Sequence, residues 1–300
     1  MDAPAIEIRS LTKKFGAITA VDDLTFTAQP GRVTGFLGPN GAGKSTTLRA
    51  LVGLVEPTSG AALIDGRPYA QLDRPAQWVG AHFEGAFHPG RTARDHLKVY
   101  SSQAGVEEGR CSEVLELVGL SDAAGRRVGG FSMGMKQRLG LATALLGNPR
   151  VLILDESANG LDPAGVQWLR AFLRAFAANG GTVLLSSHLL SEVELTVDDV
   201  VIVAGGALRH ASSISDLRGM TDASVTLASP HADRLASFLT DRFPGSANLT
   251  DPTHARITGA TAAQVGAAAF ADGLEVHGLE DSRESLETVF LRLTSQEVAA

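Results

Sequence analysis

The sequence of 300 residues contains a single cysteine, Cys111, so it cannot form an internal disulfide. That scarcity fits a reducing cytoplasm, where thiols are kept reduced. No apolar run approaches the roughly 20 residues that an α-helix needs to cross a bilayer. The first residues lack the basic and apolar segments of a signal peptide, so we expect none. If the protein works at a membrane, another subunit must supply the spanning helices.

Basic residues are also in short supply. The sequence has 26 Lys and Arg against 33 Asp and Glu, a net charge of -7, so no overall positive field favours binding to nucleic acid. The 44% of hydrophobic residues is ordinary for a globular protein. The length is enough for one large domain and a small one. Local motifs must therefore indicate the chemistry.

The most informative segment is rich in glycine and ends in a lysine. Residues 38–45 satisfy the G-x-x-x-x-G-K-S/T pattern of phosphate-binding loops. The apolar run Val33–Leu37 before them predicts a buried strand, and residues 46–52 read as the opening of a helix. Between such elements, backbone N–H groups and the helix N-terminus would face phosphate oxygens. The alternative is a glycine-rich turn with an unrelated lysine, which chance seldom places between such flanks.

This loop predicts a nucleotide site. We expect Lys44 to reach the β- and γ-phosphates and the Ser45 hydroxyl to hold Mg²⁺. The residues of the loop that we expect to contact nucleotide are Gly38, Pro39, Asn40, Gly41, Ala42, Gly43, Lys44, Ser45 and Thr46.

A second motif places two carboxylates after an apolar run. Val151–Leu154 predicts a parallel strand buried on both faces, and Asp155 and Glu156 follow it. Because parallel strands deliver their last residues to the ligand-binding edge of a sheet, we expect Asp155 to complete the Mg²⁺ site begun by Ser45. We expect Glu156 to polarise the water that attacks the γ-phosphate. The alternative is an exposed acidic turn, which the phosphate loop upstream disfavours.

Strand-like and helical runs alternate along the chain. Residues 92–147 and Gln167–Ala178 read as helical, while Thr182–Leu185 and Val200–Val203 read as buried strands, which implies an α/β core. After about residue 210 the order becomes β-α-β-β-α-β, the ferredoxin-like arrangement. The elements expected there are strands at 223–228, 247–249, 255–258 and 274–278, and helices at 232–243, 261–271 and 283–293. The apolar stripe of the last helix is expected to pack against the body of the protein.

The segment Phe131–Leu139 narrows the kind of phosphate-loop protein. Ser132 is a good N-cap, and a helix start with a free hydroxyl and the small Gly134 is a further anion site. Here the sequence resembles the ATP-binding subunits of ABC transporters, in which Ser-Gly-Gly-Gln usually stands where Ser132-Met-Gly-Met stands. The resemblance covers residues about 5 to 210. It implies two subunits arranged head to tail, each ATP lying between one subunit's phosphate loop and the other's Ser132 and Gly134.

Further motifs of that family follow in the right order. Phe15 matches the aromatic that stacks on adenine, the alternative being a core aromatic. The loop from Asn159 to Asp162 matches the segment that couples the two sites across the dimer. His188 follows the strand at 182–185 and matches the histidine that contacts the γ-phosphate, although a lone histidine is usually structural.

Three positions depart from the family pattern. Met133 and Met135 replace Gly and Gln, but Ser132 and Gly134 remain for the anion contacts. Glu84 stands where most of the family has a glutamine that senses Mg²⁺ and the attacking water. It is therefore a candidate for both the catalytic and the metal-binding set, although a carboxylate adds negative charge near the phosphates. This variant is similar to the branch of bacitracin and daunorubicin exporters. Residues 285–290 also resemble the C-terminal tail of that branch.

The resemblance implies an α/β fold with a P-loop NTPase core of the ABC type and a small C-terminal α+β domain. We expect the ABC ATPase domain over residues 1–210, with a helical subdomain at about 85–148, and the accessory domain over 211–300. The resemblance implies ATP and Mg²⁺ as ligands. It also implies two partners, a second copy of the chain and a separate transmembrane permease. Residues 84–92 should face a cytoplasmic helix of that permease. The location implied is the cytoplasmic face of the cell membrane, with no nucleic-acid partner.

The function expected on this basis is the ATP-hydrolysing subunit of an ABC-2 type exporter of antibiotics or drugs. One alternative is a soluble ABC-type ATPase that acts on nucleic acid or ribosomes, which the single phosphate loop and the net charge of -7 disfavour. Another is a nucleotide-dependent interaction protein with negligible turnover, which the presence of both Glu156 and His188 disfavours. The sequence does not identify the transported molecule.

Overall fold

The structure is a computed structural model that describes residues 4–83, 87–221, 223–283 and 285–295. The chain forms two compact units. The N-terminal unit extends to Ile214 and includes the chain end from Leu293, and the C-terminal unit is Ser215–Arg292. The two units are described separately below.

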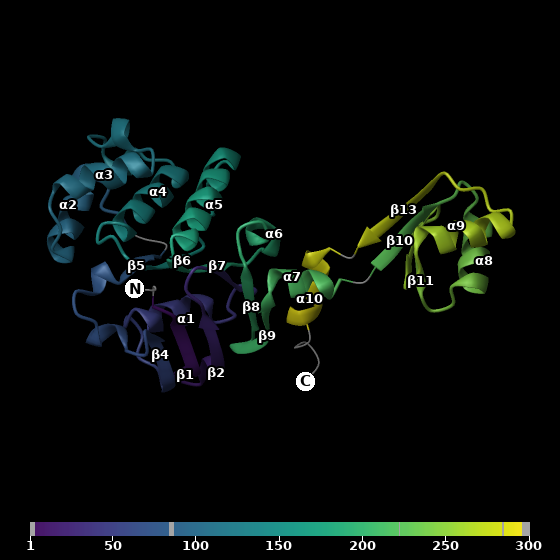
Figure 1. The fold of residues 1–300 in the computed structure, drawn as a ribbon, viewed down its shortest axis with the longest axis horizontal. Coiled ribbons are helices and arrows are strands. Elements are labelled where there is room, and N and C mark those ends of the chain that lie inside the picture. The colour runs from purple at the N-terminus through teal and green to yellow at the C-terminus, as the bar shows by residue number, and fades with distance from the viewer. Residues whose placement is uncertain (1–3, 84–86, 222, 284, 296–300) are drawn as a thin grey trace. The chain divides into compact units, whose positions relative to one another are not determined.

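A six-stranded sheet with the strand order β5-β6-β7-β3-β8-β9 forms the centre of the N-terminal unit (Figure 1). The first five strands are parallel, and β9 is antiparallel to β8. Every residue of β3, β6 and β7 is buried, as their apolar sequences predict. The strands are β3 (Val33–Leu37), β5 (Val79–His82), β6 (Val151–Asp155), β7 (Thr182–Ser187), β8 (Asp199–Ala204) and β9 (Ala207–Ser213). Because β6, β7 and β3 are neighbours, the loops that follow them lie at one edge of the sheet.

A second, antiparallel sheet of order β2-β1-β4 shares its core with the central sheet. Its strands are β1 (Ile6–Phe15), β2 (Ile18–Ala28) and β4 (Ser59–Ile64). Helix α1 (Lys44–Leu51) contributes Leu48 to the same buried cluster as Ile8 of β1 and Phe36 of β3. The phosphate loop therefore leads from a buried strand into a helix that the core holds in place.

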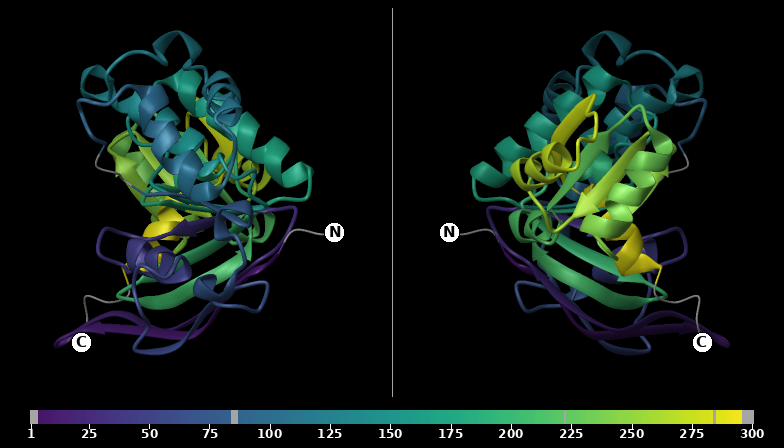
Figure 2. Two further views of the ribbon diagram at one scale, coloured as in Figure 1. Left: turned by 90° about the vertical axis from the view of Figure 1, so that its left-hand side faces the viewer. Right: turned by 90° about the vertical axis from the view of Figure 1, so that its right-hand side faces the viewer.

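Helices α2, α3 and α4 contact one another and lie together in Figures 1 and 2, in the region predicted to be helical. Helix α4 also packs on β5, and α5 packs on β7 and β3. The helices of this unit are α2 (Ala93–Ala104), α3 (Gly109–Leu117), α4 (Met133–Ala144), α5 (Pro163–Ala178) and α6 (Leu190–Val193). Helix α7 (Ile214–Gly219) begins at the last residue of this stretch and otherwise belongs to the C-terminal unit. Among the described residues, no helix is long and apolar enough to cross a membrane.

Helix α5 confirms the helix expected at Gln167–Ala178, and the three aromatic residues along it do not form its buried face. Trp168, Phe172 and Phe176 are half-buried and follow one another along the helix, with ring centroids 5.6 and 6.3 Å apart. The buried face carries Leu169 and Leu173, one position along from the first two aromatics.

The C-terminal unit has a four-stranded antiparallel sheet of order β11-β12-β10-β13, with α8 and α9 packed on it (Figure 1). Residues such as Val225 and Ile257 of the sheet share a buried cluster with Leu235 and Val265 of the helices. The elements are β10 (Ala223–Ala228), α8 (Ala232–Arg242), β11 (Ala247–Asp251), β12 (His254–Thr258), α9 (Ala262–Ala271), β13 (Gly278–Arg283) and α10 (Leu286–Thr294). The predicted fold class, an α/β core with a small C-terminal α+β domain, is confirmed.

Two predicted ranges in this unit are wrong. The last strand is β13 (Gly278–Arg283) and not 274–278, and the last helix begins at Leu286 and not at Arg283. Leu274, the first residue of the predicted strand, lies between elements and is buried in the core of the unit. The real strand pairs with β10 at the edge of the sheet, and Leu279 is its one apolar side chain, so its sequence lacks the pattern by which a strand is recognised. The apolar stripe of α10 is buried at Leu286, Val289 and Phe290.

Candidate functional site

The phosphate loop, Glu156 directly after β6 and His188 after β7 line one cavity of about 390 Å³ in the N-terminal unit. The adjacency of β3, β7 and β6 brings these distant segments together, because the residues after parallel strands gather at one sheet edge. The volume is in the range of small-molecule sites. The cavity is lined by Ala20, Asn40, Gly41, Ala42, Gly43, Lys44, Ser45, Thr46, Glu156, Asn159 and His188.

Two glycines of the loop, Gly38 and Gly43, lie too close to neighbouring backbone atoms to carry a side chain. A side chain at Gly38 would bring its Cβ to 2.3 Å from the Val203 carbonyl oxygen. Gly43 has a φ of 95° and would bring a Cβ to 2.4 Å from the Ala20 carbonyl oxygen. Gly43 is also the N-cap of α1 and provides no side-chain cap. The first N–H groups of α1 are therefore left for another acceptor, which suits a phosphate.

Lys44 lies at the base of the cavity and is only 6% exposed. Its Nζ donates to the carbonyl oxygens of Gly38 at 2.6 Å and Pro39 at 3.3 Å, and lies 3.5 Å from Glu156 Oε1. Burial lowers the pKa of Lys44, and the negative charge of Glu156 opposes that effect. The loop thus fixes an ammonium group where it can meet phosphate oxygens.

Glu156 occupies a left-handed backbone conformation with a φ of 50°. Residues other than glycine seldom adopt it, and such strain is concentrated at functional sites. Its Oε2 accepts a hydrogen bond from His188 Nδ1 at 2.8 Å and lies 3.5 Å from Asn159 Nδ2. The carboxylate is thereby held between His188 and Lys44, facing the cavity.

Asp155 is the last residue of β6 and is 5% exposed. Its Oδ1 accepts a hydrogen bond of 2.5 Å from the hydroxyl of Ser186 on β7. No cluster of three or more His, Cys, Asp or Glu side chains able to hold a metal occurs in the part of the chain that the structure describes. Mg²⁺ usually takes only one or two protein oxygens and completes its shell with substrate phosphates and water. The oxygens of Ser45 and Asp155 fit that requirement.

The predicted residues Gly38, Pro39 and Asp155 are not among those that line this cavity, and three further predicted residues line a different one. Ser132, Gly134 and Asp162 line a separate cavity of about 360 Å³ in the N-terminal unit. Ser132 caps α4 as predicted, and its Oγ accepts from the Met135 N–H at 3.2 Å. Asp162 caps α5 by accepting from the Gly165 N–H at 2.8 Å, a structural role that the sequence analysis missed. The predicted residues thus form two groups within one chain.

Phe15 and Glu84 complete the predicted set. Phe15 ends β1 with half of its surface exposed, so the alternative of a core aromatic is wrong. Lys13 Nζ lies 4.9 Å from the centroid of the Phe15 ring. The ring does not line the phosphate-loop cavity. Glu84 lies outside the described residues.

The structure also reveals polar residues to which the sequence analysis assigned no role. Ser186 contacts Asp155, and the only hint in the sequence is the pair of hydroxyls before His188. His82 of β5 is buried, and its Nε2 lies 2.6 Å from Gln137 Oε1 of α4. Burial lowers the pKa of His82. A buried hydrogen bond thus links the strand that leads to Glu84 with the helix that Ser132 caps.

A third cavity of the N-terminal unit, about 680 Å³, lies where α2, α4 and the segment before β5 meet. Tyr69 and Tyr100 contribute aromatic surface, and backbone and small side chains make up much of the remainder. Thr143 of α4 lines it, and this residue also contacts His96. Polar side chains such as Arg74 and Gln103 also line it, so the cavity has a mixed polar and apolar surface.

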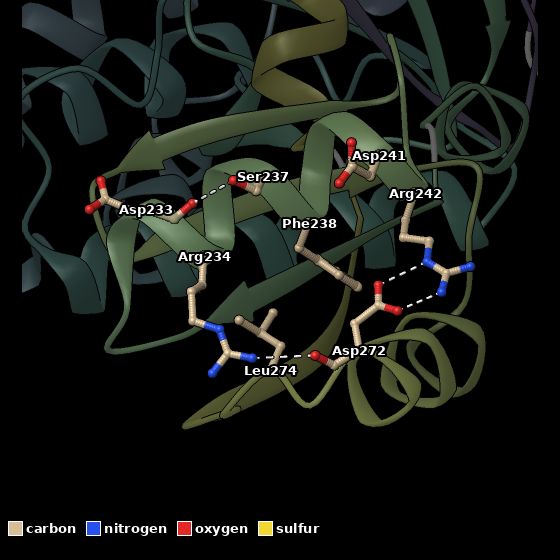
Figure 3. Close-up of a pocket in the computed structure, with 8 residues that line it drawn as sticks. All are labelled: Asp233, Arg234, Ser237, Phe238, Asp241, Arg242, Asp272 and Leu274. Carbon is tan, nitrogen blue, oxygen red and sulfur yellow. Dashed lines mark hydrogen bonds and ion pairs between the residues drawn. The ribbon is translucent and has the colours of Figure 1, made fainter.

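The C-terminal unit has a cavity of about 620 Å³ between α8 and the residues that follow α9 (Figure 3). Its charged groups are largely paired. Arg242 binds both carboxylate oxygens of Asp272, and Arg234 donates to the carbonyl oxygens of Asp272 and Gly273. These contacts hold the end of α9 against α8, which is a structural role.

Comparison with known proteins gives consistent matches. The sequence matches the ABC transporter family over residues 21–159 and a domain family of unknown function over residues 223–287. The bacitracin transport ATP-binding protein BcrA of Bacillus licheniformis is 42% identical over 207 residues, which are 68% of each chain. The uncharacterized ABC transporter ATP-binding protein YcbN of Bacillus subtilis is 33% identical over 296 residues, which are 96% of each chain. A solved ATP binding subunit of an ABC transporter is 29% identical with a TM-score of 0.65, over 71% of this chain and 92% of that one.

Proposed function

The chain belongs to the ABC transporter family of ATP-binding proteins, and from that premise we propose that it drives export through a separate membrane subunit. It is an ATPase of this family and binds ATP. The observation that carries the proposal is the meeting of the phosphate loop, Glu156 and His188 at one cavity. Similarity to a bacitracin transport protein supports an antibiotic or a related compound as the exported class.

We assign the residues of this cavity to hydrolysis as follows. The N–H groups of the loop and the ammonium of Lys44 bind the phosphates, which supplies positive charge where the γ-phosphate leaves. Glu156 orients the attacking water and accepts its proton, and its position between Lys44 and His188 supports this assignment. His188 orients Glu156 through Nδ1 and leaves Nε2 to face the γ-phosphate.

We propose Mg²⁺ as the cofactor, held by the Ser45 hydroxyl and the Asp155 carboxylate together with phosphate oxygens and water. When bound, Mg²⁺ neutralises charge that develops on the β- and γ-phosphates. Of the two acidic residues at the end of β6, Glu156 contacts Lys44 directly, whereas Asp155 acts on Lys44 only through its charge. Asp155 Oδ1 accepts from the Ser186 hydroxyl, and we assign the other carboxylate oxygen to the metal. Glu84, the remaining candidate for this set, stays a prediction.

We propose that two copies of the chain act together, each completing the site of the other. The separation of Ser132, Gly134 and Asp162 from the phosphate-loop cavity supports this arrangement. The chain would sit at the cytoplasmic face of the membrane against a permease, near residues 84–92. The cavity between α2, α4 and the segment before β5, which has both aromatic and polar lining residues, is our candidate for the contact with a helix of that permease. We also propose an ATPase domain over residues 1–210 and an accessory domain over 211–300, which the division of the chain near Ile214 supports.

The alternative of an ATPase that acts on nucleic acid or ribosomes finds no support. The relatives described above are transport proteins, and the net charge of -7 provides no positive surface field for a polyanion. The alternative of a binding protein with negligible turnover would leave the strained, paired Glu156 without a purpose.

The shared-site proposal is tested by mixing two inactive variants, Lys44→Ala and Ser132→Arg. In a mixed dimer, one composite site carries both defects and the other carries neither. Partial ATPase activity should therefore reappear on mixing. If each chain completed its own site, every site in every mixture would be defective. Absence of recovery, with mixed dimers demonstrated by two different affinity tags, would reject the shared site.

A further inference from the structure

Ser186 lies on β7 directly beside the acidic end of β6. The two strands are parallel, and Asp155 is the register partner of Ser186. Ser186 is only 1% exposed, so its hydroxyl has no access to bulk water. A buried hydroxyl must find its partners within the protein.

Both partners of this hydroxyl belong to the acidic pair. The Ser186 hydroxyl donates to Asp155 Oδ1 at 2.5 Å and accepts from the backbone N–H of Glu156 at 3.0 Å. The Ser186 hydroxyl thus donates its single proton to the Asp155 carboxylate and accepts a hydrogen bond from the backbone of Glu156. Replacing it would leave a buried carboxylate oxygen and a backbone N–H each short of a partner.

The second contact coincides with the strained residue. Glu156 has a φ of 50°, and its side chain leaves β6 toward Lys44 and His188 while Asp155 stays under Ser186. Strained conformations persist only where the surroundings fix them. The hydrogen bond to Ser186 fixes the peptide group between the two carboxylates, where the chain direction changes.

We propose that Ser186 is a positioning residue for ATP hydrolysis, which holds the Asp155 carboxylate toward the metal and the Glu156 carboxylate toward the attacking water. The proposal rests on the functions assigned above to Asp155 and Glu156. Outer partners of metal-binding groups typically change affinity or activity by about 10- to 100-fold when removed. We expect an effect of that size from loss of this hydroxyl.

The neighbouring Ser187 provides a matched control. It is on the same strand, is 2% exposed and also makes hydrogen bonds with its hydroxyl. Those bonds, however, go to the other side of the strand. Its Oγ accepts from the Leu189 N–H at 3.0 Å and lies 3.0 Å from Glu192 Oε2. Ser187→Ala removes an equally buried hydroxyl from the same element without touching the acidic pair.

The experiment compares Ser186→Ala and Ser187→Ala in the full-length protein. Ser186→Ala should lower kcat by about 10- to 100-fold and raise the Mg²⁺ concentration needed for half-maximal activity. Calorimetry should show that Mg²⁺ strengthens ATP binding less in this variant, while ATP binding in EDTA stays the same. Ser187→Ala should change none of these quantities, although both variants should lose a similar amount of thermal stability.

Two further variants make each outcome decisive. Ser186→Thr keeps the hydroxyl and should retain most of the activity. The proposal is overturned if Ser186→Ala and Ser187→Ala have the same kcat and the same Mg²⁺ dependence. It is also overturned if Ser186→Thr has a normal Tm but loses as much kcat as Ser186→Ala. Glu156→Gln separates this proposal from its premise. Full activity of Glu156→Gln would reject the function assigned to Glu156, whereas its inactivity beside a normal Ser186→Ala would reject only Ser186.

Discussion

Acid should destabilise the N-terminal unit through His96 of α2. This residue is 5% exposed, and its ring lies 5.1 Å from Phe87 and 4.9 Å from Tyr100 between ring centroids. Its Nε2 is 3.2 Å from Thr143 Oγ1 of α4. Burial, with a smaller effect from the charge of Arg91, lowers the pKa of His96 from 6.5 to about 4. In the folded protein His96 is therefore neutral at any pH above that value.

The sign follows from proton counting. Between pH 6.5 and pH 4 the unfolded chain binds a proton at His96 that the folded chain does not, so stability falls as the pH is lowered. The contribution is fully present above the unfolded pKa of 6.5 and is lost by about pH 4. That difference in pKa corresponds to a loss of about 3 kcal/mol in the free energy of unfolding across this interval. This is a large part of the stability of an ordinary domain.

Urea unfolding at pH 7.5 and pH 4.5 measures the effect. The only tryptophans, Trp78 and Trp168, belong to the N-terminal unit, so their fluorescence reports its unfolding. His96→Leu should remove about 2 to 3 kcal/mol of the acid-induced loss. The exposed His88 serves as control, because His88→Gln should leave the loss as in the wild type. His82 acts in the same direction as His96, so some acid sensitivity should remain in His96→Leu. An unchanged loss in His96→Leu would refute the reasoning.

Three other predictions concern the site and its support. Glu156→Gln should keep ATP binding but lower turnover by about 100-fold or more, and the trapped dimer should persist in gel filtration with ATP; a normal hydrolysis rate would contradict the assignment. Lys44→Ala should weaken ATP binding by about 10- to 100-fold in calorimetry without unfolding the protein, because a charge-assisted contact is lost; equal affinity would count against the phosphate site. Gly140→Ala would place a Cβ 2.0 Å from the His82 ring and should cost about 1 to 3 kcal/mol in urea unfolding. Gly109→Ala, which has open space around it, should be neutral or stabilising, and equal effects of the two changes would be evidence against the packing argument.

Much of the fold could be predicted because its central strands are chemically distinct. Val33–Leu37 and Val151–Leu154 are short apolar runs, and such runs are typical of parallel strands covered on both faces. Prediction failed at β13, where Glu280 and Asp281 lie on an edge strand and the apolar Leu274 lies outside it. Edge pairing is decided by the partner strand, so a local pattern does not specify it.

The site shows the same limit. Lys44, Glu156 and His188 could be predicted because each lies in a motif with its own local sequence, and the structure brings all three to one cavity. His82 carries no such motif, and Gln137 lies in the segment Phe131–Leu139 without a role that the sequence assigns to it. Their buried hydrogen bond depends on how α4 packs on β5, and Gly140 provides the space for the ring. Packing between elements distant in sequence cannot be inferred from either element alone.

Ser186 illustrates how a single sheet register determines chemistry. In a strand, successive side chains point to opposite faces, so Ser186 and Ser187 cannot both reach Asp155. Parallel pairing of β7 with β6 sets Ser186 opposite Asp155, and a slip of one residue would present Ser187 instead. All six residues of β7 are buried, so a slip would move every side chain to the opposite face and disrupt its packing contacts. The same packing that stabilises the sheet therefore decides which of two adjacent, chemically identical hydroxyls holds the acidic pair in place.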